Sequence, residues 1–236
     1  MNDFKLVDGA EYKPMISEMR HGKAFTREEF TKRGIIYPGM SAKITNSFRH
    51  LRTSLLSKMD QFNSCIMVSS LQKGGGASYI SLNLATTFTF DHQKTALLID
   101  CNFNTPSLAE RLGVEFEFGL EEFLTGEVDD IGSIVYPTGV PRLRLVPSGK
   151  QKSEITEFFT GAKITHFLDE VRNRYPDRII ILDAPPIRDS ADSKILTEYC
   201  DHVLLVVPYK GVISSTINKT LSSIDRSKVI GMVLNN

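Results

Sequence analysis

The chain has 236 residues, 41% of them apolar, so it is long enough to bury a substantial core in one domain. Its 28 basic and 28 acidic residues balance, so no overall field favours binding to nucleic acid or to an anionic membrane. The sequence contains neither a run of about 18 apolar residues nor a signal-peptide pattern at its start, and we expect a cytoplasmic protein.

The first 45 residues differ in composition from the rest of the chain. They are rich in charged residues and have no sustained apolar period. We therefore expect residues 1–45 to form an extended or partly disordered N-terminal arm, with one short helix at 26–33, and residues 46–236 to form a single domain.

Strand-like and helix-like segments alternate through this domain. Six apolar runs predict strands at 65–69, 95–100, 143–147, 179–183, 202–207 and 229–234. Helical patterns lie between them at 78–90, 107–112, 163–174, 190–200 and 214–224. Runs such as 179–182 and 203–207 are continuously apolar, which is typical of strands covered on both faces. The pattern predicts an α/β fold with a doubly wound, mostly parallel sheet, helices on both faces and a ligand site at the carboxyl ends of the strands.

Residues 69–78, here called the glycine loop, follow the first predicted strand and precede a predicted helix. Strand, glycine turn and helix form the context of a phosphate-binding loop (P-loop). A P-loop ends in Gly-Lys-Ser/Thr, whereas this chain has Gly76-Ala77-Ser78. Backbone N–H groups and the helix N-terminus can still attract phosphate, although the lysine side chain is replaced by a methyl group. A flexible turn is the simpler alternative.

Two further strands end in a carboxylate. Asp100 follows Leu97-Leu98-Ile99, and Asp183 follows Ile179-Ile180-Ile181-Leu182. A carboxylate beside a phosphate loop can hold Mg²⁺ directly or through water, whereas a single strand-terminal aspartate often only caps the next helix. Two of them beside a glycine loop favour the functional interpretation.

Three cysteines, Cys65, Cys101 and Cys200, are widely spaced within apolar runs. This placement predicts small buried apolar side chains and not a metal or redox site.

The order and spacing of these motifs resemble the bacterial tyrosine kinase (BY-kinase) domain of exopolysaccharide and capsule biosynthesis, a branch of the ParA/MinD-like P-loop group. The resemblance extends from about Phe48 to Asn236. Besides the glycine loop and the two aspartates, the matching segments are Phe48-Arg49-His50-Leu51-Arg52-Thr53, Asn83-Leu84-Ala85, Pro106-Ser107-Leu108, Gly119-Leu120, Leu124-Thr125-Gly126, Val146-Pro147-Ser148-Gly149, Tyr175-Pro176-Asp177-Arg178, Asp183-Ala184-Pro185-Pro186, Asp192 and Val233-Leu234-Asn235. It implies a P-loop NTPase fold and an ATP-dependent protein-tyrosine kinase.

The resemblance also implies a role for each site residue. The phosphates of ATP or ADP would contact Lys73, Gly74, Gly75, Gly76, Ala77 and Ser78. Ser78, Asp100 and Asp183 would surround Mg²⁺, with the two aspartates also acting in catalysis, and Asn235 would contact the adenine. Arg49 and Arg52 match the arginines of a Glu-x-x-Arg-x-x-Arg oligomerisation motif, for which a solvated helix face is the alternative.

Four positions depart from the family pattern. Ala77 replaces the phosphate-binding lysine, and Asn102 replaces the second aspartate of an Asp-x-Asp motif. Asn46 replaces the glutamate of the oligomerisation motif, and Gly75 occupies a position that is usually acidic. We also expect the chain to lack, after Asn236, the tyrosine-rich tail of such kinases. Because phosphoryl transfer depends on positioned positive charge, we expect an impaired enzyme.

Lys73 lies four positions before Ala77 in the same loop and could replace the lost cation, although a solvated lysine is the simpler alternative. We expect any family-type ring of subunits to be weakened, because Asn46 cannot offer a carboxylate to a neighbour's arginine.

Two functions remain. The favoured one is a pseudokinase, a homo-oligomer or a monomer, that docks on the cytoplasmic tail of a membrane polysaccharide co-polymerase or on a related active kinase at the inner face of the plasma membrane. The rival is an active protein-tyrosine autokinase with a rearranged site. A weaker alternative is a ParA/MinD-type ATPase, which needs a second loop lysine where this chain has Gln72.

Overall fold

The computed structural model describes residues 22–60, 63–150, 159, 161–174, 178–209 and 214–235. Residues 1–21 of the predicted arm, the matching segment at 175–177 and Asn236 lie outside these ranges. The strands of the described residues are β1 (Cys65–Ser70), β2 (Thr95–Asp100), β3 (Tyr136–Pro137), β4 (Leu143–Val146), β5 (Arg178–Asp183), β6 (His202–Pro208) and β7 (Val229–Asn235).

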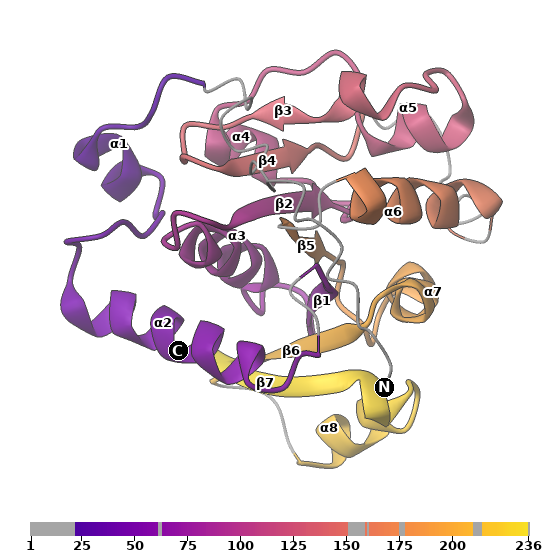
Figure 1. Ribbon diagram of the computed structural model, residues 1–236. Helices are drawn as coiled ribbons and strands as arrows, with labels where there is room; N and C mark the ends of the chain where they lie inside the picture. Colours follow the sequence, from indigo (N-terminus) through magenta and orange to yellow (C-terminus); the bar gives the residue numbers. More distant parts are fainter. Residues whose placement is uncertain are drawn as a thin grey trace, which may run out of the picture.

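These strands form one sheet in the order β3-β4-β2-β5-β1-β6-β7 (Figure 1). Neighbouring strands are parallel except for β3 and β4, which are antiparallel. The helices of the described residues are α1 (Arg27–Lys32), α2 (Ala42–Leu56), α3 (Ala77–Phe88), α4 (Leu108–Leu112), α5 (Leu120–Thr125), α6 (Ala162–Arg174), α7 (Ala191–Tyr199) and α8 (Ser214–Leu221), with 3₁₀ turns η2 (Ile131–Ile134) and η4 (Arg226–Lys228).

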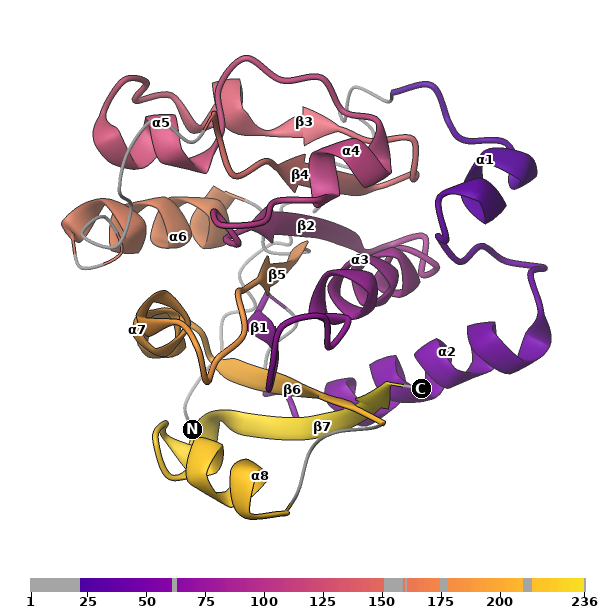
Figure 2. The same cartoon turned by 180° about the vertical axis from the view of Figure 1, so that it is seen from behind.

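Helices cover both faces of the sheet, as Figures 1 and 2 show from opposite sides. The two faces have separate cores. Cys65 and Met67 of β1 pack into a core with α5, α6 and α7, whereas Ile66 and Val68 of the same strand pack into a core with α2, α3 and α4. Because successive side chains of a strand point to opposite faces, a strand buried on both faces needs apolar residues throughout. The predicted doubly wound α/β fold is confirmed.

The predicted elements agree closely with the structure. Each of the six predicted strands is present with its ends within one residue of the prediction, and the five predicted helices are present as α3, α4, α6, α7 and α8. The sequence analysis missed α2, α5 and β3. Strand β3 has only two residues, and α2 buries only Thr45, Phe48 and Leu55, so both carry a weak apolar pattern.

The segment before α2 is closely packed in the part that the structure describes. Helix α1 lies within the predicted range 26–33, and Thr26 and Glu29 form a capping box at its start. After α1, Ile35 and Ile36 are fully buried in the core that contains α3. The division of the chain near residue 45 stays a prediction.

Asn83 of α3 connects this segment to the domain. The Ile36 N–H donates to Asn83 Oδ1 at 2.8 Å, and Asn83 Nδ2 donates to the carbonyls of Gly34 (3.1 Å) and Tyr79 (3.0 Å). The side chain is fully buried. The Asn83-Leu84-Ala85 motif therefore includes a residue that holds residues 34–36 against α3.

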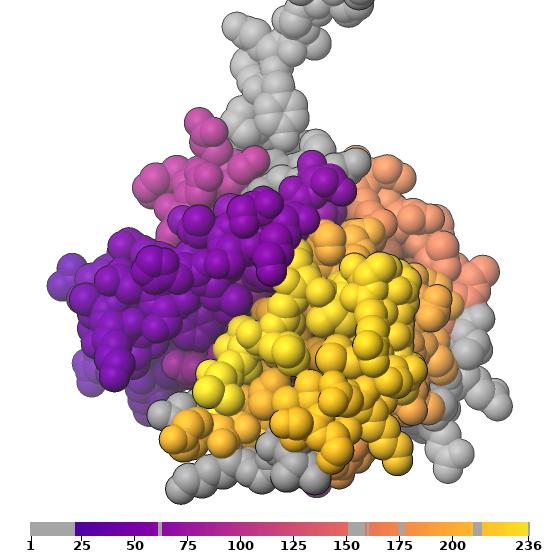
Figure 3. Space-filling view, turned by 90° about the horizontal axis from the view of Figure 1, so that it is seen from below, coloured from indigo at the N-terminus to yellow at the C-terminus, as the bar shows by residue number. Residues whose placement is uncertain are grey.

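Helix α2 and strand β7 lie side by side at the surface (Figure 3) and line a common hollow. Among the described residues, no helix combines the length and the apolar composition needed to cross a bilayer. Cys65, Cys101 and Cys200 are free and buried, as predicted, and burial raises the pKa of the Cys200 thiol to about 12.

Replacement of Asn83 by alanine should destabilise the fold, because it leaves the buried Ile36 N–H without its acceptor. We expect Asn83→Ala to lower the free energy of unfolding by about 1–3 kcal/mol in a denaturant titration. Asn218→Ala on the exposed side of α8 is the control, with an expected change within about 0.5 kcal/mol. Equal stability of the two variants would contradict the role of Asn83.

Candidate phosphate-binding site

The glycine loop connects β1 to α3 in a conformation that requires its glycines. Gly74 and Gly76 have positive φ angles of 76° and 88°, which side-chain-bearing residues rarely adopt. A Cβ atom at Gly75 would lie 2.6 Å from Cβ of Ser70, so the usual acidic side chain would not fit this loop as it stands. Ala77 begins α3 directly after the loop. The loop therefore turns tightly and presents the N-terminus of a 12-residue helix, a common site for phosphate.

Side chains from two strands hold the loop in place. Ser70 Oγ donates to the carbonyl of Gln72 at 2.8 Å, and Asn235 Nδ2, at the end of β7, donates to the carbonyl of Gly75 at 3.1 Å. The amide predicted to contact an adenine is thus engaged with the loop itself. Its role toward a nucleotide stays a prediction.

Asp100 and Asp183 are register partners on the adjacent strands β2 and β5, and both are buried. Asp100 is bonded to the backbone. Its Oδ1 accepts from the Asn102 N–H at 3.2 Å, and its Oδ2 accepts from Ser107 (3.2 Å) and Leu108 (3.1 Å) at the start of α4. Burial raises the pKa of Asp100 to about 6, and these three hydrogen bonds oppose the rise. Asp100 therefore caps the start of α4, as strand-terminal aspartates often do for the next helix.

Asp183 has a different environment. Neither of its carboxylate oxygens has a hydrogen-bond partner among the described residues. Burial and then the charge of Asp100 raise the pKa of Asp183 to about 8, while the Ser78 and Ser81 hydroxyls and the charge of Arg111 act in the opposite direction. The structure thus brings Ser78 and Asp183 together, with an unsatisfied carboxyl group beneath the loop.

A cleft of about 510 Å³ lies beside the glycine loop, and we call it the loop cleft. It is lined by residues of the glycine loop, by the segment after β2 and by the segment after β5: Ser70, Lys73, Gly74, Gly75, Gly76, Ala77, Ser78, Tyr79, Asn102, Asn104, Thr105, Ser107, Arg111, Ala184, Pro185, Pro186, Asp189 and Ser190. Among these residues the cations are Lys73 and Arg111, and both are exposed.

The sequence analysis missed Arg111. It belongs to no P-loop motif, and the available signal was its position four residues after Ser107, which places both on one side of α4. Asn102 lines the loop cleft as a neutral amide whose Oδ1 accepts from the Thr105 hydroxyl at 3.3 Å.

The predicted oligomerisation residues lie apart from the loop cleft, on α2. Arg52 Nη1 donates to the carbonyl of Thr87 in α3 at 2.8 Å, and the Arg49 guanidinium lies 6.0 Å from the centre of the Phe90 ring. Asn46 is exposed on the same helix. Arg52 therefore has a partner within its own chain, whereas Arg49 and Asn46 face outward.

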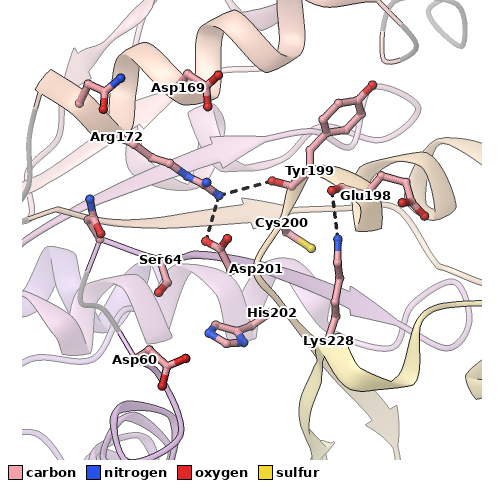
Figure 4. A pocket seen from close by; sticks show the side chains of 12 residues that line it. Asp60, Ser64, Asp169, Arg172, Glu198, Tyr199, Cys200, Asp201, His202 and Lys228 are labelled. Carbon is pink, nitrogen blue, oxygen red and sulfur yellow. Dashed lines mark hydrogen bonds and ion pairs between the residues drawn. The ribbon is translucent and has the colours of Figure 1, made fainter.

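A larger pocket, of about 800 Å³, lies at the other end of the sheet, where β6 begins (Figure 4). Its cations are already bonded within the protein. Arg172 donates to Asp201 at 2.9 Å, and Lys228 Nζ donates to the carbonyls of Thr197 (2.7 Å) and Glu198 (3.0 Å). Size alone therefore does not make it the better candidate for an anion site.

Ser78 of the loop cleft and the buried Asp183 next to it fit Mg²⁺ and phosphate in part. The unpaired Asp183 oxygens and the Ser78 hydroxyl are hard oxygen donors of the kind Mg²⁺ prefers. The described residues contain no group of three or more His, Cys, Asp and Glu that could hold a metal alone. The fit is therefore to Mg²⁺ that also binds water and phosphate oxygens, beside a glycine loop of the kind whose N–H groups bind anions.

The raised pKa of Asp183 predicts a pH-dependent stability. A carboxyl group whose pKa rises from 3.8 to about 8 on folding stabilises the fold fully below its unfolded pKa, and this contribution is lost as the pH rises through 8. We expect the stability of Asp183→Asn relative to wild type to rise by about 1–3 kcal/mol between about pH 5 and 9, measured by chemical denaturation without Mg²⁺. The exposed Asp189→Asn is the control. Parallel pH profiles for wild type and Asp183→Asn would contradict the prediction.

Comparison with known proteins shows a similarity to bacterial tyrosine kinases. No protein-family model matches the sequence. It is 28% identical over 192 residues to the tyrosine-protein kinase wzc of Salmonella typhimurium, which covers 80% of this chain and 26% of that protein. It is 29% identical over 196 residues to the tyrosine-protein kinase CpsD of Streptococcus agalactiae, which covers 82% of each. The chain thus spans about a quarter of wzc and most of CpsD.

Solved structures of bacterial tyrosine kinase domains share the fold of this chain. The kinase domain of VpsO superimposes with a TM-score of 0.72 at 26% identity, covering 82% of this chain and 94% of that one. The kinase domain of the Escherichia coli tyrosine kinase ETK gives a TM-score of 0.77 at 19% identity, covering 93% and 83%. A plasmid partition protein of Borrelia burgdorferi shares the fold more distantly, with a TM-score of 0.56 at 21% identity over 72% of this chain and 77% of that one. This chain is therefore a homologue of the bacterial tyrosine kinases, with the fold common to BY-kinase domains and ParA/MinD-like P-loop proteins.

Proposed function

We propose that this protein is a BY-kinase-like regulator of exopolysaccharide or capsule biosynthesis and export that acts as a pseudokinase. One observation carries the proposal. The loop cleft keeps the glycine loop, and Asp100 and Asp183 are buried at the strand ends, but the cleft has a methyl group at Ala77 and a neutral amide at Asn102. A scaffold that keeps its shape and lacks its charges is suited to binding and not to phosphoryl transfer.

The missing charges affect binding and catalysis differently. Loss of one charge-assisted hydrogen bond costs about 1.5–3 kcal/mol, roughly ten- to a hundredfold in affinity. Weak binding of ATP or ADP through the loop N–H groups and Ser78 is compatible with that loss. Transfer of the γ-phosphoryl group depends almost entirely on charges placed around it, so the same loss has a larger effect on rate.

The protonation of Asp183 supports the same conclusion. Mg²⁺ at this site would be held by Ser78 and Asp183, near Asp100, and when bound would neutralise the phosphate oxygens. Burial and the charge of Asp100 raise the pKa of Asp183 and so favour its protonated form, with which a bound cation must compete. A lysine at position 77 would favour the ionised form, and Ala77 cannot.

The partner in this proposal is a membrane polysaccharide co-polymerase, through its cytoplasmic tail, or a related active kinase. The support is the resemblance to BY-kinases and the similarity to CpsD over most of its length. The protein would then act in the cytoplasm at the inner face of the plasma membrane. In a homo-oligomer built through α2, Arg49 would be exposed to a neighbour, but Asn46 would supply no carboxylate.

An active autokinase is the second candidate, and one observation favours it. Lys73 and Arg111 both line the loop cleft, so the positive charge lost at Ala77 has two replacements nearby. The ParA/MinD-type ATPase is weaker, because those neighbours show only a shared fold and Gln72 stands where their second lysine is expected.

Nucleotide binding should be weak, because the loop lacks its lysine while its N–H groups remain. Calorimetry of the purified protein with Mg²⁺-ATP should give a dissociation constant well above the micromolar range. Ala77→Lys should tighten binding by about ten- to a hundredfold. Tight, Mg²⁺-dependent binding by the unmodified protein would contradict the prediction.

Catalysis should be absent for two independent reasons, the methyl group of Ala77 and the amide of Asn102. Incubation with Mg²⁺-ATP should produce no phosphotyrosine. Ala77→Lys combined with Asn102→Asp should restore ATP hydrolysis or phosphorylation of a supplied tyrosine substrate, with an effect greater than the sum of the single changes, because both groups serve one transition state.

The matched control adds Asp183→Asn to this double variant, which should remove the restored activity. Strong phosphotyrosine formation by the unmodified protein, abolished by Asp183→Asn alone, would overturn the pseudokinase proposal and favour the autokinase.

A further inference from the structure

Arg111 is a cation at the loop cleft that no P-loop motif predicts. It lies in the last turn of α4 and lines the cleft together with Gly74, Gly76 and Ser78. Its charge also acts on Asp183, the buried carboxyl group beneath the loop. Arg111 is therefore positioned to act on the same site as the glycine loop, but from a different element.

The guanidinium of Arg111 is available for a ligand. Within the described ranges it has no hydrogen bond or ion pair, and the residue is exposed. Other arginines of these ranges are already engaged: Arg33 donates to the carbonyl of Arg111, Arg52 to that of Thr87, and Arg172 to Asp201. A guanidinium that lines a polar cleft and lacks a protein partner retains all five of its donors.

The backbone that carries Arg111 is held at both ends. Asp100 accepts hydrogen bonds from Ser107 and Leu108 at the start of α4, and Arg33 Nη1 donates to the carbonyl of Arg111 at 2.9 Å at its end. Leu108 and Leu112 are buried in the core. Because the helix is anchored, less entropy is lost when Arg111 binds a ligand than for a side chain on a loose loop.

Lys73 is the competing cation, and its setting is less favourable. It is an exposed residue in the turn before Gly74, and within the described ranges its ammonium group has no contact that fixes its direction. A lysine ammonium is a point charge on a flexible chain, whereas the arginine fork can bond two phosphate oxygens at once. The comparison favours Arg111.

We propose that Arg111 is the phosphate-binding cation of this protein and takes the place of the lysine that is absent at position 77. The polyphosphate group of a nucleoside di- or triphosphate would lie between the N–H groups of the glycine loop and the Arg111 guanidinium. The inference rests on the proposed function only in assuming that the loop cleft still receives a nucleotide. It assigns the affinity for phosphate to a residue of α4 instead of α3.

The test is calorimetry of the full chain with three probes, namely Mg²⁺-ATP, inorganic tripolyphosphate and adenosine. Arg111→Ala should weaken binding of ATP and of tripolyphosphate by the same factor, about ten- to a hundredfold, and leave adenosine binding unchanged. Arg111→Lys should recover part of the loss. Lys73→Ala should change the affinity by less than about threefold.

Lys32→Ala is the matched control. Lys32 is an exposed cation that lines the adjoining hollow with Arg111 but does not line the loop cleft, so its loss should leave all three affinities unchanged. Unfolding midpoints of all variants, measured in parallel, should equal that of wild type, because Arg111, Lys73 and Lys32 are exposed.

Each outcome bears on the proposal. Equal affinity of Arg111→Ala and wild type for tripolyphosphate, or a larger loss from Lys73→Ala, would overturn it. No binding of any probe by the wild-type protein at millimolar concentration would also overturn it, while leaving the pseudokinase proposal intact. Phosphotyrosine formation by the wild-type protein would overturn the pseudokinase proposal but not the assignment of Arg111.

Discussion

Parallel pairing of β1 with both β5 and β6 is the constraint on which the site depends. It makes β1 an interior strand, so its side chains must suit two apolar cores, and it brings the ends of β1 and β5 to one edge of the sheet. The next pairing, between β5 and β2, places Asp100 beside Asp183. Strand order alone brings the loop, the helix N-terminus and both carboxyl groups to this edge, and no side-chain contact between them is needed.

Two aspartates at equivalent positions have separate tasks in this arrangement. Asp100 accepts three backbone N–H bonds and fixes the start of α4, whereas Asp183 lies beneath the loop with both oxygens unpaired. Two buried carboxyl groups on neighbouring strands repel each other when ionised, and a bound cation would relieve that repulsion. In a chain with Ala77, the relief comes from a proton, from Mg²⁺ or from a cation outside the loop. Asp100 both fixes the start of α4 and raises the pKa of Asp183 through its charge. The same carboxyl group therefore connects the position of α4 with the charge at Asp183.

The N-terminal segment and the last strand both contact the α3 region, although they lie far apart in the sequence. Asn83 bonds residues 34–36 to α3, and Asn235 bonds the end of β7 to the glycine loop. Both contacts are hydrogen bonds between an amide side chain and the backbone. One amide therefore holds the segment before α2 against α3, and the other holds the glycine loop against the end of β7.

The sequence by itself determined the strands, the fold class, the glycine loop and the positions of Asp100 and Asp183, because continuous apolar runs, glycine clusters and strand-terminal carboxylates are local patterns. It also showed that Ala77 and Asn102 lack the charges their positions usually carry. Only the tertiary structure decided that Asp100 caps α4, that Asn235 bonds the loop and that Arg111 lines the cleft. Those facts depend on which distant segments the sheet brings together, and no local pattern of residues records that pairing.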